Sequence, residues 1–217
     1  IVGCDLFDLM DHTEALVKAA WVALESPAVV GLHGPLDLTG KFERMEVREA
    51  FRRHAGIDPW SYDNSQDLAE AARNRGHRVS RLEGTWDDIF FEIFLNSVEP
   101  QLGRDKPTFL WGWPASQAAL SRLDPSDPTR ALRFELYAGG YELANAFDEL
   151  TDPVEQRRRF ENEQADRAQN GRPVYPIDAA LIAALGKMQQ TAGIALGVDR
   201  LVMLLTGSRD IREVQSW

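Results

Sequence analysis

Four carboxylates and one amide lie in the segment ELYAGGYELANAFDE, which runs from Glu135 to Glu149. These polar residues are Glu135, Glu142, Asn145, Asp148 and Glu149. Carboxylates that lie close together repel each other unless a cation lies between them. A hard divalent ion such as Mg²⁺, brought in with phosphate groups, would neutralise two of them. The spacing therefore makes this segment a candidate cation site.

The adjacent glycines Gly139–Gly140 predict a two-residue hairpin loop between two alternating runs. In that register Tyr137 lies opposite Glu142, and Glu135 lies opposite Ala144. Glu135 and Glu142 are then diagonal neighbours, with backbone positions roughly 7–8 Å apart. The prediction assigns one face to Arg133, Glu135, Tyr137, Glu142, Ala144 and Ala146, and the opposite core face to Phe134, Leu136, Leu143 and Phe147. The alternative is a hairpin whose polar face meets only water.

A second group of candidate residues lies in the segment GIALGVDRLVML. Small residues alternate there with bulky ones, so a strand would have a bare face of Gly193, Ala195 and Gly197 and a bulky core face of Ile194, Leu196 and Val198. A bare face lets a flat ligand approach the backbone closely. Arg200 begins the next helix, where its guanidinium and the helix N-terminus both favour a phosphate. The alternative is a tightly packed strand, with Arg200 in a salt bridge.

The first part of the chain is predicted to be mainly helical. Apolar spacing predicts a helix over residues 5–24 and an insertion-like, mainly helical region over residues 25–103. Within that region, Ser65 and Thr85 are expected to cap helices, and residues 29–32 are expected to form a short strand.

Residues 104–217 have a different pattern, which predicts an antiparallel sheet. A strand is expected to end at Pro114 and to be followed by the hairpin. Next come a long charged helix, with Thr151 as its expected cap, and a shorter helix. The small-residue strand turns directly into the last helix. The hairpin and this strand are therefore expected to lie in one sheet.

The totals limit the class of protein. The chain has 217 residues, a formal net charge of −10 and one cysteine, Cys4. The negative charge argues against a broad nucleic-acid-binding face, and the one basic cluster, at residues 157–159, lies among glutamates and indicates a solvated helix face. No apolar run approaches the roughly 20 residues that span a bilayer. A lone cysteine and the lack of a secretory leader pattern favour the cytoplasm.

Several of these segments resemble one enzyme family. GIALGVDRLVMLLTG resembles motif 3 of class II aminoacyl-tRNA synthetases, and FELYAGGYELANAFDEL with EQRRRFE resembles the lysyl-tRNA synthetases of that class. KPTFLWGWPASQAAL and GRPVYPIDAALIAALGKM are similar to their short paralogues, the elongation factor P–lysine ligases. The resemblance covers nearly the whole chain and is most specific from Lys106 to Gly207. It implies an α+β fold in which residues 1–217 form one class II catalytic domain.

The resemblance also implies roles for the candidate residues. The catalytic residues would be Arg200 and Glu142. The residues that bind ATP would be Glu135, Glu142, Gly197 and Arg200, and Mg²⁺ would lie on Glu135 and Glu142. The residues that bind lysine would be Asn145, Glu149, Gly193 and Ala195. Asp148 receives no role and is expected to be solvated.

Two details of the pattern bear on the substrate. Ala195 stands where lysyl-tRNA synthetases usually have glycine, and the added methyl favours β-lysine over α-lysine by roughly 1–3 kcal/mol at most. Asn145 and Glu149 fall on the opposite face from Glu142 in a regular strand. If all three line one site, the strand must contain a β-bulge between Glu142 and Asn145.

The implied reaction is the activation of lysine or β-lysine by ATP and its transfer to a lysine of elongation factor P. The segments that match motifs 1 and 2 would precede residue 1, so the resemblance implies an N-terminally truncated domain that is a homodimer when full length. One alternative is a fragment of a lysyl-tRNA synthetase, although a tRNA partner is not favoured by Ala195. The other is a non-catalytic remnant that binds a ligand or a partner.

Overall fold

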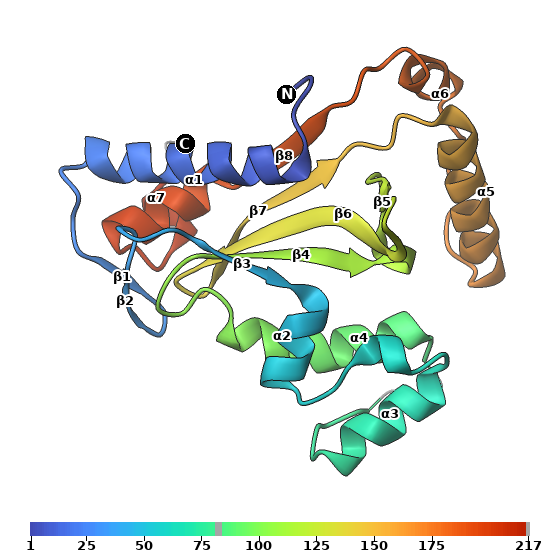
Figure 1. Cartoon of the computed structure of the whole chain (residues 1–217), viewed down its shortest axis with the longest axis horizontal. Coiled ribbons are helices and arrows are strands. Elements are labelled where there is room, and N and C mark those ends of the chain that lie inside the picture. Colours follow the sequence, from blue (N-terminus) through green and yellow to red (C-terminus); the bar gives the residue numbers. More distant parts are fainter. Residues whose placement is uncertain (81–83, 216–217) are drawn as a thin grey trace.

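A mixed β-sheet forms the centre of the molecule (Figure 1). The computed structural model describes residues 1–80 and 84–215. In this part of the chain the sheet has six strands: β3 (Glu43–Glu46), β4 (Thr108–Pro114), β5 (Leu123–Asp124), β6 (Asp127–Ala138), β7 (Tyr141–Asp148) and β8 (Ala192–Leu196). Their order is β3-β4-β6-β7-β8, with β5 beside β6, and only β3 and β4 pair in parallel. The predicted α+β fold is confirmed, with one parallel edge strand added.

Helices cover both faces of this sheet (Figure 1). The α-helices are α1 (Leu6–Ala23), α2 (Val47–His54), α3 (Ser65–Asn74), α4 (Trp86–Ile93), α5 (Pro153–Gln169), α6 (Ala179–Leu185) and α7 (Val198–Thr206). A π-helical turn (Phe94–Val98), four 3₁₀ turns (Pro59–Ser61, Glu99–Gln101, Ala115–Gln117 and Ile211–Glu213) and a small hairpin of β1 (Val29–Gly31) and β2 (Gly34–Leu36) complete the described structure. Helices α1 and α7 lie on one side of the sheet, α2 and α4 lie on the other, and α5 and α6 stand beyond one end.

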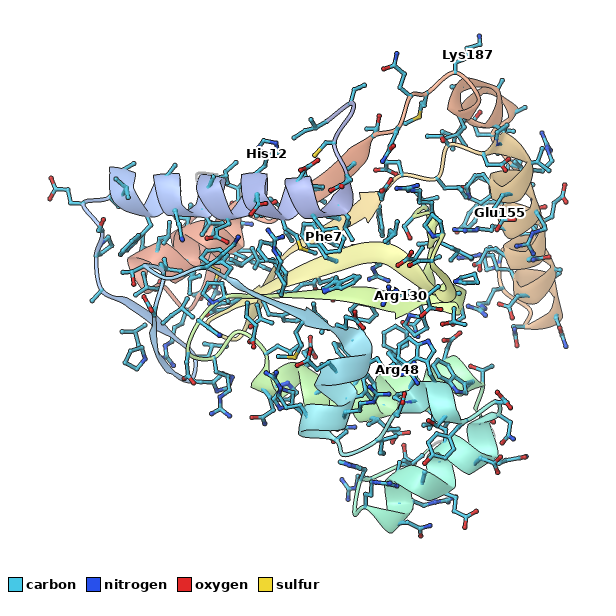
Figure 2. The ribbon with its side chains drawn as sticks, viewed as in Figure 1. Phe7, His12, Arg48, Arg130, Glu155 and Lys187 are labelled. Atoms are coloured by element: carbon cyan, nitrogen blue, oxygen red, sulfur yellow. The ribbon has the colours of Figure 1, made fainter. Side chains whose placement is uncertain are left out.

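Alternation along β4 divides the interior into two cores. Phe109 packs in a core that includes α1, and Leu110 packs in a second core that includes α2, α3 and α4. On the first side, Phe7 points from α1 toward the sheet (Figure 2), and its ring lies edge-on to Trp111 with centroids 5.0 Å apart. Because Glu135 lies opposite Leu110, its side chain is on the side of the second core.

The helix caps are set by local chemistry, and one of the three predicted caps is confirmed. Thr85 accepts the N–H of Asp88 in a capping box, as predicted. Helix α3 is capped by Asn64 instead of Ser65, and α5 is capped by Asp152 instead of Thr151. Because Pro153 occupies the first position of α5 and fixes where the helix begins, the cap is the residue directly before it.

The prediction that residues 25–103 are mainly helical is wrong for its first third. Residues 29–36 form the β1–β2 hairpin, Glu43–Glu46 is strand β3, and helices begin only at Val47. The strand expected near residues 29–32 is present as β1. Strand β3 pairs with a strand more than 60 residues later in the chain, Glu43 lying beside Thr108. A short strand with such a distant partner has no local pattern that reveals it.

The tip of the β6–β7 hairpin is held by close backbone contacts on two sides. The N–H of Leu32 donates to the carbonyl of Gly139, and the N–H of Gly139 donates to the carbonyl of Gly103, both at 2.7 Å. A Cβ atom on Gly103 would lie 2.4 Å from the Tyr137 carbonyl carbon and oxygen. Gly103 also has a φ of +61°, which disfavours any L side chain. The hairpin that carries the candidate site is therefore clamped in place by residues from distant segments.

We expect Gly103→Ala to lower the free energy of unfolding by about 2–5 kcal/mol, because backbone strain adds to an overpacked contact. Gly76→Ala is the matched control. Gly76 has a φ of +83° but no atom within 4 Å of a new Cβ, so only the strain of about 1–2 kcal/mol remains. Urea unfolding measures both. Equal losses in the two variants would show that the close contact at Gly103 does not hold the hairpin.

Candidate active site

A β-bulge brings the candidate residues to one face of the sheet. Leu136 lies opposite Ala144, but the next residue, Tyr137, lies opposite Glu142, so Leu143 is the extra residue in β7. The bulge predicted between Glu142 and Asn145 is confirmed, as is the pairing of Tyr137 with Glu142. Glu142 and Asn145 consequently share the face of β6 that carries Tyr137.

The same bulge corrects the predicted faces further along β7. Glu135 lies opposite Asn145 instead of Ala144. Ala144 and Ala146 were assigned to the polar face, but both are buried in the core beneath α1. Phe147 was assigned to the core, but it lies opposite Arg133, whose guanidinium is 5.8 Å from its ring centroid. One inserted residue reverses every later side chain, which is why a uniform register was wrong beyond Glu142.

Four residues form a row across four strands on this face. Leu110 lies opposite Glu135, Glu135 opposite Asn145, and Asn145 opposite Ala195. Exposure increases along the row, from the fully buried Leu110 through Glu135, which is 6% exposed, to the exposed Ala195. The candidate site therefore opens at β8, while its β4 end is closed by the second core.

Strand β8 and the helix after it form as predicted, and β8 ends directly before α7. The bulky side of β8 is less buried than predicted, because Ile194 is 37% exposed, and Val198, which was expected on the same face, is instead the first residue of α7 and is 62% exposed. In the described part of the chain, β8 pairs only with β7 and is an edge strand of the sheet. Its outer edge is engaged only at its start among the described contacts, where the Ile1 amino group donates to the Ala192 carbonyl at 2.7 Å and the Ala192 N–H donates to the Ile1 carbonyl at 3.1 Å.

The Glu135 carboxylate is buried inside a network of donors. Arg133 forms an ion pair with it, the hydroxyl of Tyr137 donates to Oε2, and Nδ2 of Asn145 donates to Oε1 at 3.4 Å. Burial raises the pKa of the Glu135 carboxyl, as does the charge of Glu142, while Arg133 and Tyr137 act in the opposite direction. Burial beside this carboxylate also raises the pKa of Tyr137. Oδ1 of Asn145 is buried and has no hydrogen-bond partner.

Arg200 and Glu142 meet at the start of α7. Nη1 of Arg200 donates to the carbonyl of Glu142 at 2.7 Å and lies 3.9 Å from its carboxylate. Both side chains are substantially exposed, 52% for Arg200 and 36% for Glu142. The two residues that were predicted to meet the phosphates are thus adjacent and accessible.

A third acid near Glu142 was missed by the sequence reasoning. Glu99 lies in the 3₁₀ turn before β4, and burial together with the charge of Glu142 raises its pKa. Glu99 lies shortly before Gly103, the glycine that packs against the backbone of Tyr137. Its only sequence signal was a carboxylate at the end of an apolar helix, which is too common to single it out.

Glu149 lies just after β7 and turns its carboxylate toward β8. An ideal Cβ on Gly193 would be only 2.3 Å from Oε1 of Glu149, so this carboxylate rests on the bare glycine. Burial, and then the charge of Asp148, raise the pKa of Glu149. Asn145 and Glu149 therefore lie beside neighbouring small residues of the same strand, Ala195 and Gly193.

Asp148 was expected to be solvated, and this is wrong. It is 1% exposed, and its Oδ2 pairs with Nη2 of Arg122 at 2.7 Å. The backbone N–H of Arg122 also donates to the carbonyl of Asp148. Because the two residues are far apart in sequence, no local pattern could link them. Asp148 fastens the loop before β5 to β7 and lies on the side opposite Glu149.

Comparison with known proteins identifies the family. The family model "tRNA synthetases class II (D, K and N)" matches residues 4–217. The chain belongs to this family. It is 44% identical over 173 residues to an elongation factor P–(R)-β-lysine ligase of Klebsiella pneumoniae strain 342, which covers 79% of this chain and 53% of the relative. A ligase of the same name from Erwinia tasmaniensis is 44% identical over 174 residues.

This class II synthetase chain spans about half the length of the curated relatives that it matches. Family membership agrees with the fold, since the strand that turns into α7 lies beside the acidic hairpin as the resemblance implied. None of the described helices is both long enough and apolar enough to cross a membrane.

The donor set of this class II synthetase chain suits a metal ion that arrives with its substrate better than a resident one. Among the described residues, no group of three His, Cys, Asp or Glu side chains is arranged to hold a metal. The Glu142 carboxylate is accessible and has one long ion pair. Glu135 has both oxygens engaged and would have to exchange a partner. Mg²⁺ is usually bound by one or two carboxylates plus substrate phosphates, and these residues fit that mode.

Proposed function

We propose that the protein activates lysine or β-lysine with ATP and transfers the acyl group to a lysine side chain of elongation factor P. The observation that carries this proposal is the 44% identity to relatives named elongation factor P–(R)-β-lysine ligase, over 79% of the chain. The site geometry supports it, because an acid suited to an amine lies beside Gly193 of β8 and an arginine suited to a phosphate lies beside Gly197, just after the same strand. We place the reaction in the cytoplasm, in keeping with the single, buried cysteine.

The amine end of the site is formed by Glu149 and Asn145. Glu149 would pair with the side-chain ammonium of lysine, because its carboxylate is partly buried and is influenced by the charge of the Ile1 amino group only as the smallest of the causes that shift its pKa. Asn145 donates from Nδ2 to Glu135, which leaves its buried Oδ1 available to a donor on the substrate. The amide would thereby orient the amino acid between the two ends of the site.

The phosphate end of the site is formed by Arg200, Glu142 and Gly197. Arg200 would bind the phosphates of ATP through its forked N–H groups while Nη1 stays near the Glu142 carbonyl. Gly197 leaves the backbone bare beside Arg200. Glu142, with Glu135 behind it, would hold Mg²⁺. The ion, when bound, offsets negative charge on the leaving pyrophosphate.

The chemistry needs no nucleophile from the protein. A carboxylate oxygen of the amino acid attacks the α-phosphorus of ATP, and the bond to the bridging oxygen breaks to release pyrophosphate. The acceptor amine then attacks the acyl carbon, AMP leaves, and the amine proton passes to solvent. The residues of this chain hold the two reactants close together and stabilise the charge that develops on the phosphates.

Ala195 is the residue that we expect to discriminate between the lysine isomers. It lies opposite Asn145 on the open side of the row, and its methyl reduces the space over the strand. A methyl in a pocket is worth about 1–3 kcal/mol. We therefore propose (R)-β-lysine as the preferred substrate and α-lysine as a weaker one.

The test is pyrophosphate exchange followed by acyl transfer. The intact protein should exchange pyrophosphate into ATP in the presence of (R)-β-lysine, and more slowly with α-lysine. It should then label elongation factor P and leave tRNA uncharged. Charging of tRNA instead would favour a lysyl-tRNA synthetase. Undetectable binding of Mg²⁺-ATP by calorimetry would favour a non-catalytic protein.

A further inference from the structure

Three small residues, two in β8 and one directly after it, lie beside different functional side chains. Gly193 lies beneath Glu149, Ala195 lies opposite Asn145, and Gly197 lies next to Arg200. The contacts differ in severity. A Cβ on Gly197 would be 3.5 Å from its nearest neighbour, which is ordinary contact, whereas a Cβ on Gly193 would be 2.3 Å from Oε1 of Glu149.

The backbone gives no reason for glycine at position 193. Gly193 is not one of the described glycines that have a positive φ, and it pairs regularly with Phe147 within β8. At such a strand position alanine is normally favoured over glycine by roughly 0.5–1 kcal/mol. A side chain at this position would strike the Glu149 carboxylate, because the three described atoms nearest to the ideal Cβ all belong to Glu149.

We propose that Gly193 is a positioning residue that determines which amine the site accepts. Its missing Cβ lets the Glu149 carboxylate lie flat against the strand, and this sets the depth of the amine end of the site. The inference rests on the proposed function, because it assigns Glu149 to the substrate ammonium. It adds a second selection, for the length of the diamino acid, to the selection of isomers that we assign to Ala195.

A methyl at position 193 has a predictable effect on the site. Ordinary contact begins at 3.4 Å, so Oε1 must move from 2.3 Å to at least that distance, a shift of 1.1 Å. The strand blocks movement in one direction, so the carboxylate must move away from the sheet and into the space above it. A shift of this size makes the site too shallow for lysine or β-lysine and better suited to a diamino acid one methylene shorter, such as ornithine.

The experiment compares Gly193→Ala with the unchanged intact protein by pyrophosphate exchange with β-lysine, lysine and ornithine. We expect the KM for lysine and β-lysine to rise about 10- to 100-fold, and the ratio of kcat/KM for ornithine over lysine to rise at least about tenfold. The KM for ATP should not change. Gly186→Ala is the control, since Gly186 lies at the C-cap of α6 and its Cβ would make only an ordinary 3.5 Å contact, with Pro153 of α5.

A second variant tests the contact itself. Glu149→Asp shortens the acid, so adding it to Gly193→Ala should relieve the clash. The double variant should then unfold at the same temperature as Glu149→Asp alone. This comparison also decides the matter if Gly193→Ala does not fold, because a double variant that is equally unstable would show that Glu149 is not the group that requires glycine.

The outcomes separate this inference from the proposed function. Amine-dependent exchange in the unchanged protein, with the same preference in Gly193→Ala, would overturn the role of Gly193 and leave the proposed function standing. No exchange with any of the three amines in the unchanged protein would overturn both. A switch toward ornithine would support the inference, since a merely structural role would lower activity with all amines equally.

Discussion

Glu149→Gln is expected to lower kcat/KM for lysine and β-lysine by about 30- to 1000-fold in pyrophosphate exchange. Removing the charge from one partner of a partly buried ion pair costs about 2–4 kcal/mol, because the substrate ammonium is left without its counter-charge. Glutamine keeps the size of the side chain, and its amide can still lie on the bare Gly193. The loss should therefore appear in the amine and not in ATP binding.

The control for this prediction is Glu163→Gln on α5, an exposed acid whose ion pair with Arg167 lies on the helix surface. It should leave exchange unchanged, because exposed pairs contribute little. Calorimetry with Mg²⁺-ATP gives the second readout. If Glu149→Gln weakens ATP binding as much as it weakens exchange, Glu149 does not act on the amine.

Glu149 also predicts a pH dependence. Burial and Asp148 raise its pKa, so the carboxylate gains its proton at a higher pH than an ordinary glutamate does. The KM for the amine should rise as pH falls through this raised pKa, and Glu149→Gln should abolish that rise.

The raised pKa of Glu149 also affects the stability of the fold. The contribution of this group to the free energy of unfolding is present below the usual glutamate pKa and is lost as pH rises through the raised pKa. Glu149→Gln should therefore increase the free energy of unfolding at neutral pH, measured by urea titration.

Arg200→Ala is expected to lower kcat for pyrophosphate exchange by about 100- to 1000-fold. The charge that develops on the leaving pyrophosphate is stabilised by donors that are fixed before the reaction, and losing one such donor typically costs this much. Arg200 is held in place by its hydrogen bond to the Glu142 carbonyl. Its side chain is half exposed, so its removal leaves no buried cavity.

Two further variants test whether the loss of activity comes from the hydrogen-bond donors of Arg200. Arg200→Lys keeps the charge but loses the fork of donors, and it should recover only part of the activity. Arg158→Ala removes an exposed arginine that pairs with Glu155 on α5, and it should have no effect on exchange. A fall in melting temperature that matches the fall in kcat would point to loosening of the β7–α7 junction and against a role at the phosphates.

The chemistry of short segments was readable from the sequence. Gly139–Gly140 specified the hairpin and the pairing of Tyr137 with Glu142, since a two-residue loop fixes the nearest cross-strand pairs. The capping box at Thr85 and the direct passage from β8 into α7 were also readable from the sequence. Each depends on residues that are neighbours in the chain.

Other features had no local cause. The pairing of β3 with β4 and the ion pair of Arg122 with Asp148 join segments that lie far apart in sequence. The bulge at Leu143 follows from packing, because it places Leu143 and Ala144 together in the core beneath α1. A regular β7 would have put one of these two apolar residues on the polar face.

The sequence by itself determined which side chains are available: the acids around the glycine loop, the small residues of β8 and the arginine after them. Only the tertiary structure decided how they are used. The bulge moved Asn145 onto the face of Glu142, burial separated Asp148 from Glu149, and β8 placed Gly193 beneath the Glu149 carboxylate. The physical reason is that residue type is local, whereas the face, depth and neighbours of a side chain are set by strands that pair across the whole chain.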